Sequence, residues 1–212
     1  VDVTGGTVDY DVLGGNCMGG AVEGDTYITL SGSAQINEYV FGGGAGYDPD
    51  EIVTVKGNTH VTLKDNAVIG IQGGGLLLGG GAERSIVEGK VYMEVNGGTV
   101  NTVKPGGNLW PGGAGTGTGD AFVTMTGGNV AHFANWGEDS GPESSLTLSV
   151  SGADFNKANI IIGCDTTDAA LDNVSVTIDS CAISLLHFGS SITGNLSLSL
   201  RNAATDSLYL SS

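Results

Sequence analysis

A short motif recurs along the whole chain, and it constrains the fold more than any other feature of the sequence. Complete copies begin at residues 24, 57, 89, 119, 144, 172 and 194, so they lie 22 to 33 residues apart. The opening residues, VDVTGGTV, fit the same motif from its fifth position onward and add an eighth, incomplete copy. A motif that returns at this interval is typical of proteins built from stacked structural repeats.

Within each copy, apolar and polar residues alternate. The fifth and seventh positions are apolar in every copy, whereas the fourth and sixth positions between them are mostly polar. Alternation with a period of two predicts a β-strand with one buried face. The predicted inward-facing residues are Val1, Val3, Ile28, Leu30, Val61, Leu63, Met93, Val95, Val123, Met125, Leu148, Val150, Val176, Ile178, Leu198 and Leu200.

A turn dipeptide follows each of these strands. Gly, Asn and Asp recur in it, and these residues adopt the positive φ that a sharp corner requires. A second apolar stretch follows the corner, as at Val40-Phe41 and at residues 160–162, and a glycine cluster then closes many copies. The dipeptides are Gly5-Gly6, Gly32-Ser33, Asp65-Asn66, Gly97-Gly98, Gly127-Gly128, Gly152-Ala153, Ser180-Cys181 and Asn202-Ala203.

The order strand, corner, strand, glycine turn and variable return predicts an all-β fold. We expect a single-stranded parallel β-helix (β-solenoid) of about eight coils, because one copy cannot bury its apolar face alone and stacked copies can. At the usual spacing of about 4.8 Å between strands, the rod would be roughly 40 Å long. We expect a right-handed helix, the larger class among β-helices with coils this long and irregular. A β-sandwich is disfavoured, since inserts of different lengths fall at one point of the repeat.

The variable returns are rich in acidic residues. Asp48, Asp50 and Glu51 form one cluster, and two more occur within residues 138–143 and 165–172. Carboxylates suit Ca²⁺ or a cationic partner, whereas the alternative is a solvated acidic surface. Asp48, Asp50 and Glu51 are therefore the candidate metal ligands, with Ca²⁺ as the candidate ion, and no other cofactor is expected.

The fourth and sixth positions of each copy should face outward in two parallel rows. Aromatic or imidazole rings in the fourth position beside hydroxyl groups in the sixth would form a flat amphipathic strip, which suits a sugar chain or another protein. Alternatively, the rings serve only to stabilise strand pairing. The predicted ligand-binding residues are Tyr27, His60, Tyr92 and Phe122 in the first row, and Thr29, Thr62, Glu94 and Thr124 in the second.

Charge and hydropathy exclude several classes of partner. Lys and Arg number 7 against 23 Asp and Glu, for a net charge of −16, so no basic stripe for nucleic acid can form. No apolar run is long enough to span a bilayer, so membrane insertion is not expected. A hydrophobic fraction of 40% is too high for a disordered acidic tail. Three cysteines without a Cys-x-x-Cys motif indicate small buried residues.

The sequence favours a non-catalytic protein without excluding an enzyme. It contains no His-Glu-x-x-His, Gly-x-Ser-x-Gly, Walker or Gly-x-Gly-x-x-Gly motif. Parallel β-helices do, however, include polysaccharide lyases and hydrolases, and Lys56 and Arg84 accompany the acidic returns. A polysaccharide lyase or hydrolase, with the acidic returns as its site, is thus the catalytic alternative. A structural stalk is a further non-catalytic one.

The segments GDTYITLSGSAQI, GDAFVTMTGGNV and GGTVDYDVLGG resemble repeats of large surface proteins of gut-type bacteria. The resemblance covers nearly the whole chain and implies a secreted or cell-surface, adhesin-like protein that binds a glycan or a host or cell-surface protein. We expect residues 1–212 to be one β-helix domain from a longer surface protein. Because the end strands of such a rod have unpaired edges, we also expect end-to-end self-association.

Overall fold

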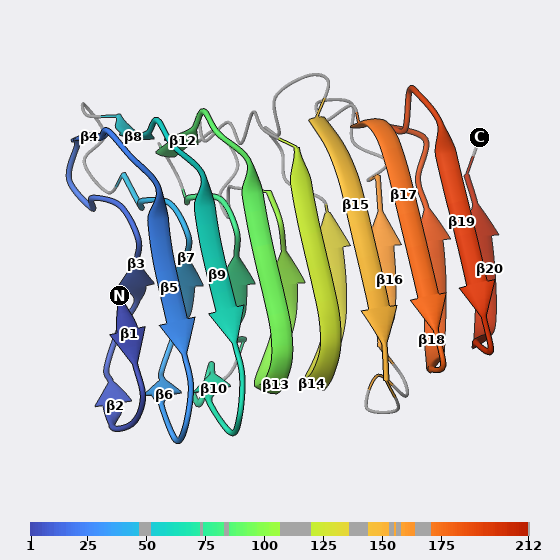
Figure 1. Cartoon of the computed structure of the whole chain (residues 1–212), viewed down its shortest axis with the longest axis horizontal. Helices are drawn as coiled ribbons and strands as arrows, with labels where there is room; N and C mark the ends of the chain where they lie inside the picture. Colours follow the sequence, from blue (N-terminus) through green and yellow to red (C-terminus); the bar gives the residue numbers. More distant parts are fainter. Residues whose placement is uncertain are drawn as a thin grey trace.

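The computed structural model is all-β and describes residues 1–46, 52–72, 74–82, 85–106, 120–135, 144–152, 155, 158–163 and 171–211. Across these residues, seventeen strands form one hydrogen-bonded sheet and three strands form a second (Figure 1). The pairings in both sheets are parallel. No helix that is long and apolar enough to cross a membrane occurs in the described part of the chain.

The strands fall into three series, each formed by corresponding parts of successive repeats. The first series is β1 (Asp2–Val3), β5 (Thr26–Leu30), β9 (Thr59–Leu63), the first halves of β13 (Val91–Lys104) and β14 (Ala121–Asn135), β15 (Ser144–Ser151), β17 (Leu171–Asp179) and β19 (Leu196–Arg201). The second series is β2 (Thr7–Val8), β3 (Val12–Leu13), β6 (Gln35–Ile36), β7 (Tyr39–Phe41), β10 (Val68–Ile69), β11 (Leu76–Leu78), the second halves of β13 and β14, β16 (Asn159–Ile162), β18 (Ala182–Phe188) and β20 (Ala204–Leu210). The third series is β4 (Gly20–Val22), β8 (Val53–Val55) and β12 (Ser85–Val87).

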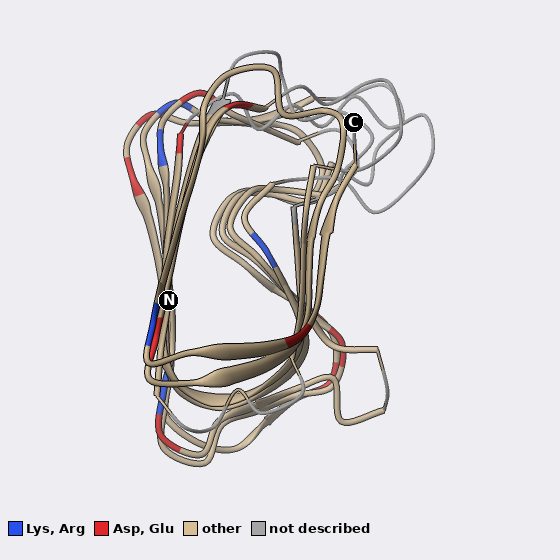
Figure 2. Cartoon of the chain, turned by 90° about the vertical axis from the view of Figure 1, so that its right-hand side faces the viewer, with Lys and Arg blue, Asp and Glu red and all other residues tan. Residues whose placement is uncertain are grey.

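Each strand pairs with the corresponding strands of the neighbouring repeats, in register. Tyr27 of β5 lies opposite His60 of β9, and His60 lies opposite Tyr92 of β13. The same register continues from Tyr92 to Phe122 of β14 and from Phe122 to Thr147 of β15. When the molecule is viewed along the direction in which the repeats stack, the paths of successive repeats nearly superimpose (Figure 2). This long, regular parallel sheet is compatible with a β-solenoid.

The core lies behind the strands of the first series, where alternation predicted it. From Ile28 to Ile178, every described residue at the fifth and seventh positions of the repeat is at most 1% exposed. Val40, Leu77, Val103, Phe133, Ile160 and Leu186 of the second series are all 0% exposed and pack into the same cluster. A continuous apolar column therefore runs through the repeats and fixes which side chains face outward.

The corners also lie where the turn dipeptides predicted them. One residue of each dipeptide has a positive φ, including the non-glycine residues Asp65 (59°), Ser180 (55°) and Asn202 (48°). In β13 and β14, however, strand pairing continues through the corner, with Gly98 and Gly128 at positive φ inside the strand. The glycine pair at these two corners bends the strand without ending it, and the register shifts locally between Val95 and Thr99.

Two details differ from the sequence-based expectations. The returns of the early repeats are not wholly irregular, because Val53–Val55 and Ser85–Val87 form β8 and β12, which pair with each other. Val53, Val55 and Val87 are fully buried, so this third series closes part of the core. Cysteine burial was predicted correctly for Cys181 and wrongly for Cys17, which is exposed; Cys164 lies outside the described residues.

Candidate functional site

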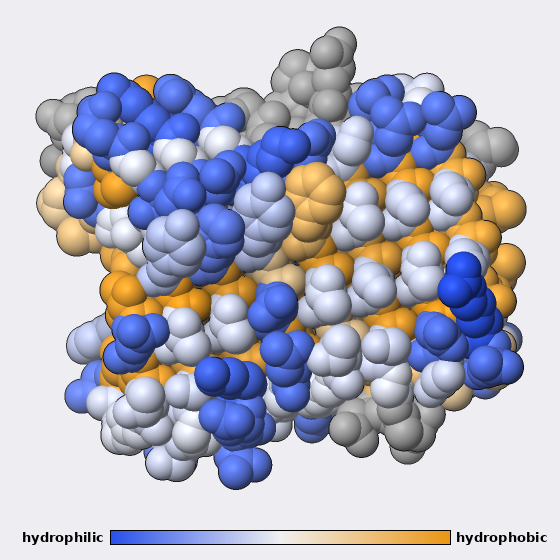
Figure 3. Space-filling model, viewed as in Figure 1, coloured by the Kyte–Doolittle hydropathy of each residue, from blue (hydrophilic) through white to orange (hydrophobic). Residues whose placement is uncertain are grey.

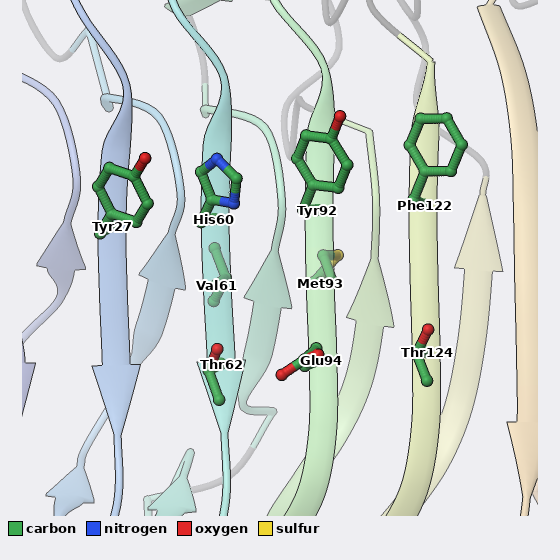
Figure 4. Close-up of a pocket in the computed structure, with 9 residues that line it drawn as sticks. All are labelled: Tyr27, His60, Val61, Thr62, Tyr92, Met93, Glu94, Phe122 and Thr124. Atoms are coloured by element: carbon green, nitrogen blue, oxygen red, sulfur yellow. The ribbon is translucent and has the colours of Figure 1, made fainter.

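Four rings stand in a row on the outer face of the sheet, one on each of β5, β9, β13 and β14. They are Tyr27, His60, Tyr92 and Phe122, which we call the ring row (Figure 4). Their neighbours in sequence, among them Ile28 and Met93, face the core, so the alternation of the strand turns the rings outward. The in-register pairing then places them side by side, as the sequence predicted.

The rings stack on one another along the row. Ring centroids are 4.5 Å apart between Tyr27 and His60, 4.8 Å between His60 and Tyr92, and 5.3 Å between Tyr92 and Phe122. The planes of neighbouring rings differ by 7°, 7° and 14°. Parallel rings at these distances are offset from one another. In Figure 4, which looks onto the outer surface of the sheet, the rings are seen obliquely rather than edge-on. Part of each ring face is therefore turned away from the sheet.

A second row of polar side chains runs beside the ring row. Thr62, Glu94 and Thr124, with the four rings and with Val61 and Met93, line a shallow hollow of about 390 Å³. Seven of the eight residues predicted to bind ligand thus border one hollow. The eighth, Thr29, lies in register with Thr62 but is not part of the lining. Figure 3 shows this face as hydrophilic rows that alternate with apolar ones.

A third row, which the alternation pattern did not predict, lies on the other side of the rings at the second position of each repeat. Asp25 accepts hydrogen bonds from the backbone N–H of Asn58 (2.7 Å) and from the hydroxyl of Tyr27 (3.2 Å). Its Oδ2 is also 3.7 Å from Nε2 of His60. In the next repeat the side chain of Asn58 accepts a hydrogen bond from the backbone N–H of Lys90 (2.9 Å). The signal was present, since this position is polar in Asp25, Asn58, Lys90 and Asp120.

At the other end of the row, a cation lies beside the last ring. Nζ of Lys90 is 5.4 Å from the centroid of the Phe122 ring and 3.7 Å from Oδ2 of Asp120. The ring row therefore has a carboxylate at Tyr27, an ammonium group at Phe122, and the carboxylate of Glu94 in the adjacent row. This mixture provides donors and acceptors along an apolar strip but no strong charge of one sign.

The surroundings of Asp25 shift two pKa values. The hydrogen bond from the backbone of Asn58 lowers the pKa of Asp25 below its usual value of 3.8, with smaller contributions from the Asn58 side chain, Tyr27 and His60. Partial desolvation and the hydrogen bond to Asp25 raise the pKa of the Tyr27 hydroxyl above 10.0. At neutral pH, Asp25 is therefore a carboxylate and Tyr27 a neutral hydrogen-bond donor.

The lowered pKa of Asp25 predicts how stability depends on pH. Since the folded protein favours the charged carboxylate, this contribution is fully present above the unfolded pKa, near 3.8, and is lost as the pH falls through the lower folded pKa. We expect Asp25→Ala to lower the midpoint of thermal unfolding at pH 7, and the difference from wild type to shrink below pH 3.8. Thermal unfolding of both proteins across this range is the measurement. A difference that stays constant with pH would contradict the role of the ionised carboxylate.

The predicted metal ligands Asp48, Asp50 and Glu51 lie outside the described residues, as does Arg84. Within the described ranges, no group of three or more His, Cys, Asp and Glu side chains is arranged to hold a metal ion. The Ca²⁺ prediction, and with it the lyase or hydrolase site in the acidic returns, therefore stays a prediction.

Comparisons with known protein families, curated proteins and solved structures find no match for this chain. The function proposed below accordingly depends on the geometry of the ring row and of the rows on either side of it.

Proposed function

We propose that this protein is a non-catalytic, secreted or cell-surface β-solenoid that binds a glycan along its ring row. In this proposal the solenoid is right-handed and has about eight coils in one domain, and the binding serves adhesion. The observation that carries the proposal is the row of four offset-stacked rings, Tyr27, His60, Tyr92 and Phe122, beside the polar row that contains Thr62, Glu94 and Thr124.

The strand directions support the solenoid and its hand. In Figure 1 the near strands β5, β9 and β15 run downward, whereas the far strands β7, β16 and β18 run upward, as the chain advances from left to right. A path with these three directions is right-handed. The in-register parallel pairing of corresponding strands supports the stacking of one coil per repeat.

The chemistry of the strip supports a sugar chain as the ligand. A pyranose presents apolar C–H groups on its faces and hydroxyl groups at its edges. The tilted ring faces would contact the C–H groups, while Thr62, Glu94 and Thr124 would hydrogen-bond to hydroxyl groups. The hollow is shallow and is lined by residues of four neighbouring strands, which suits an extended chain that crosses them better than a compact small molecule. Since both apolar and polar partners are needed, a purely apolar ligand fits less well.

The test is retention on a panel of neutral and acidic polysaccharides, with and without Ca²⁺, followed by calorimetry on soluble fragments of those retained. We expect Tyr27→Ala combined with Tyr92→Ala to weaken binding by about fivefold or more, because two stacking contacts of about 0.5–1.5 kcal/mol each are lost. Unsaturated sugar, the product expected of a lyase, is measured in the same samples.

Tyr209→Ala provides the matched control. Tyr209 is 57% exposed, close to the 58% of Tyr27, and it contacts His187 on β18 rather than the ring row. Its variant should bind as the wild type does. Equal binding by the ring-row variant and the wild type would contradict the proposal, and sugar release would replace it with the lyase or hydrolase alternative. Retention on none of the polysaccharides would leave a protein ligand or a stalk.

A further inference from the structure

The ring row repeats at a nearly constant interval and orientation. Successive ring centroids are 4.5, 4.8 and 5.3 Å apart, and successive planes differ by only 7°, 7° and 14°. Each ring is therefore close to a translated copy of the one before it, displaced by the spacing of about 4.8 Å between strands. Figure 4 shows the four rings at one level on four neighbouring strands. A ligand can make the same contact with every ring only if it repeats at this interval.

Each of the four strands also presents a polar residue on either side of its ring. These residues stand at the second and sixth positions of the repeat, two residues before and two residues after the ring. One repeat of the surface thus combines one ring face with hydrogen-bonding groups along both of its sides. The second-position residues are Asp25, Asn58, Lys90 and Asp120, and the sixth-position residues are Thr29, Thr62, Glu94 and Thr124. A single pyranose matches this set, since it has C–H groups on its faces and hydroxyl groups along its edges.

We infer that the ligand is a neutral chain of β-1,4-linked pyranoses of glucose configuration, which lies across the strands with one sugar on each ring. This inference rests on the proposed function and specifies the class of glycan. An extended β-1,4-linked chain advances with each sugar by slightly more than the distance of about 4.8 Å that separates neighbouring strands. Four successive sugars therefore stay over four successive rings, from Tyr27 to Phe122.

The ring row also selects the configuration of the sugar. Successive sugars of a β-1,4-linked chain are turned over relative to one another, so alternate faces meet successive rings. In the glucose configuration every ring substituent is equatorial, and both faces present only C–H groups to an aromatic ring. The axial hydroxyl group of mannose would be pressed against alternate rings and desolvated without a partner. An α-1,4-linked chain of glucose curves, so it leaves the straight row after one or two rings.

The charges beside the rings favour a neutral chain over a polymer of uronic acids. On these four strands the two polar rows carry three carboxylates, Asp25, Glu94 and Asp120, against the single ammonium group of Lys90. That ammonium group already lies 3.7 Å from Oδ2 of Asp120. The carboxylates can accept hydrogen bonds from sugar hydroxyl groups, whereas they would repel uronates in a protein of net charge −16.

Calorimetry with oligosaccharides of increasing length tests the inference. The probes are β-1,4-linked oligomers of glucose and of N-acetylglucosamine, with two to eight sugars. We expect the affinity for at least one series to rise by about twofold or more with each sugar up to four, and then to level off. Oligomers of α-1,4-linked glucose and of β-1,4-linked mannose are the matched control ligands. Their affinities should rise little beyond two sugars.

Extending the row by one ring gives a second, independent readout. Thr147 of β15 is exposed and lies in register with Phe122, so Thr147→Tyr places a fifth ring beside the fourth. We expect this variant to bind the five-sugar oligomer about twofold or more tighter than the wild type does, with no gain for the four-sugar oligomer. Ser175→Tyr is the matched control. It adds the same ring to the same face one strand further on, where Thr147 still interrupts the row, and should leave the length dependence unchanged.

The outcomes separate this inference from the proposed function. Equal affinities for the β-1,4-linked and α-1,4-linked four-sugar oligomers of glucose would overturn the inference and leave glycan binding in place. A folded Thr147→Tyr variant, with circular dichroism like that of the wild type, that gains nothing for five sugars would also overturn it. Absence of binding to these oligomers and to every polysaccharide of the retention panel would contradict the proposed function itself.

Discussion

Replacing Gly42 by alanine is expected to lower the free energy of unfolding by about 3 kcal/mol or more. A Cβ at this position would lie 2.2 Å from the carbonyl oxygen of Gly79 and 2.8 Å from a methyl group of Val61. The obstructing oxygen cannot move away easily, because it accepts the hydroxyl hydrogen bond of Thr59 at 2.6 Å. Gly42 itself donates to the carbonyl of Leu78 at 2.9 Å. Urea-induced unfolding, followed by circular dichroism, measures the loss.

Gly24→Ala is the matched control, since it makes the same chemical change where nothing lies within 4 Å of the added carbon. Its φ lies outside the left-handed region, so alanine fits the backbone without strain. We expect its free energy of unfolding to change by less than about 1 kcal/mol. Equal losses for the two variants would show that the close approach of the backbones at Gly42 and Gly79 does not limit the side chain.

Phe133→Ala is expected to cost about 3–5 kcal/mol of unfolding free energy, as removal of a large buried ring usually does. Phe133 is 0% exposed on β14 and lies opposite Val103 on one side and Ile160 on the other. Because its neighbours belong to an in-register column fixed by strand pairing, they cannot readily move to fill the space. The same urea titration provides the measurement.

Phe122 allows the identical substitution on the outer face of the same strand. Phe122→Ala removes the stacking contact with Tyr92 at 5.3 Å and should cost only about 1 kcal/mol. The ratio of the two losses therefore tests which face of β14 is buried. A Phe122 variant as unstable as the Phe133 variant would contradict the assignment of the ring row to the outer surface.

The parts of the fold that depend on one repeated pattern could be predicted from the sequence. Alternation identified the buried residues from Ile28 to Ile178 because burial at the fifth and seventh positions does not depend on the rest of the repeat. The third strand series was missed, since Gly20–Val22, Val53–Val55 and Ser85–Val87 share only their final valine and are only three residues long. The glycine pair Gly97-Gly98 looked like the end of a strand, although hydrogen bonding continues beyond it.

The candidate site was predictable to a similar extent. The ring row followed from the fourth position alone, because parallel pairing in register turns a sequence position into a row. The contribution of Asp25 could not be inferred in that way, since its hydrogen bonds to Asn58 and Tyr27 depend on side-chain conformations at the start of the strand. The acidic returns, predicted to bind Ca²⁺, fall partly outside the described residues, so that prediction remains open.

The pairing of each repeat with only its two neighbours has a consequence for how the protein loses order. In a one-dimensional array, a terminal unit is held on one side and an internal unit on two, so fraying begins at the ends and proceeds inward. Tyr27, His60, Tyr92 and Phe122 lie in the second to fifth repeats, each of which pairs with a repeat on both sides. The rings can therefore retain their spacing while a repeat that is paired on one side only exchanges its amide hydrogens with solvent.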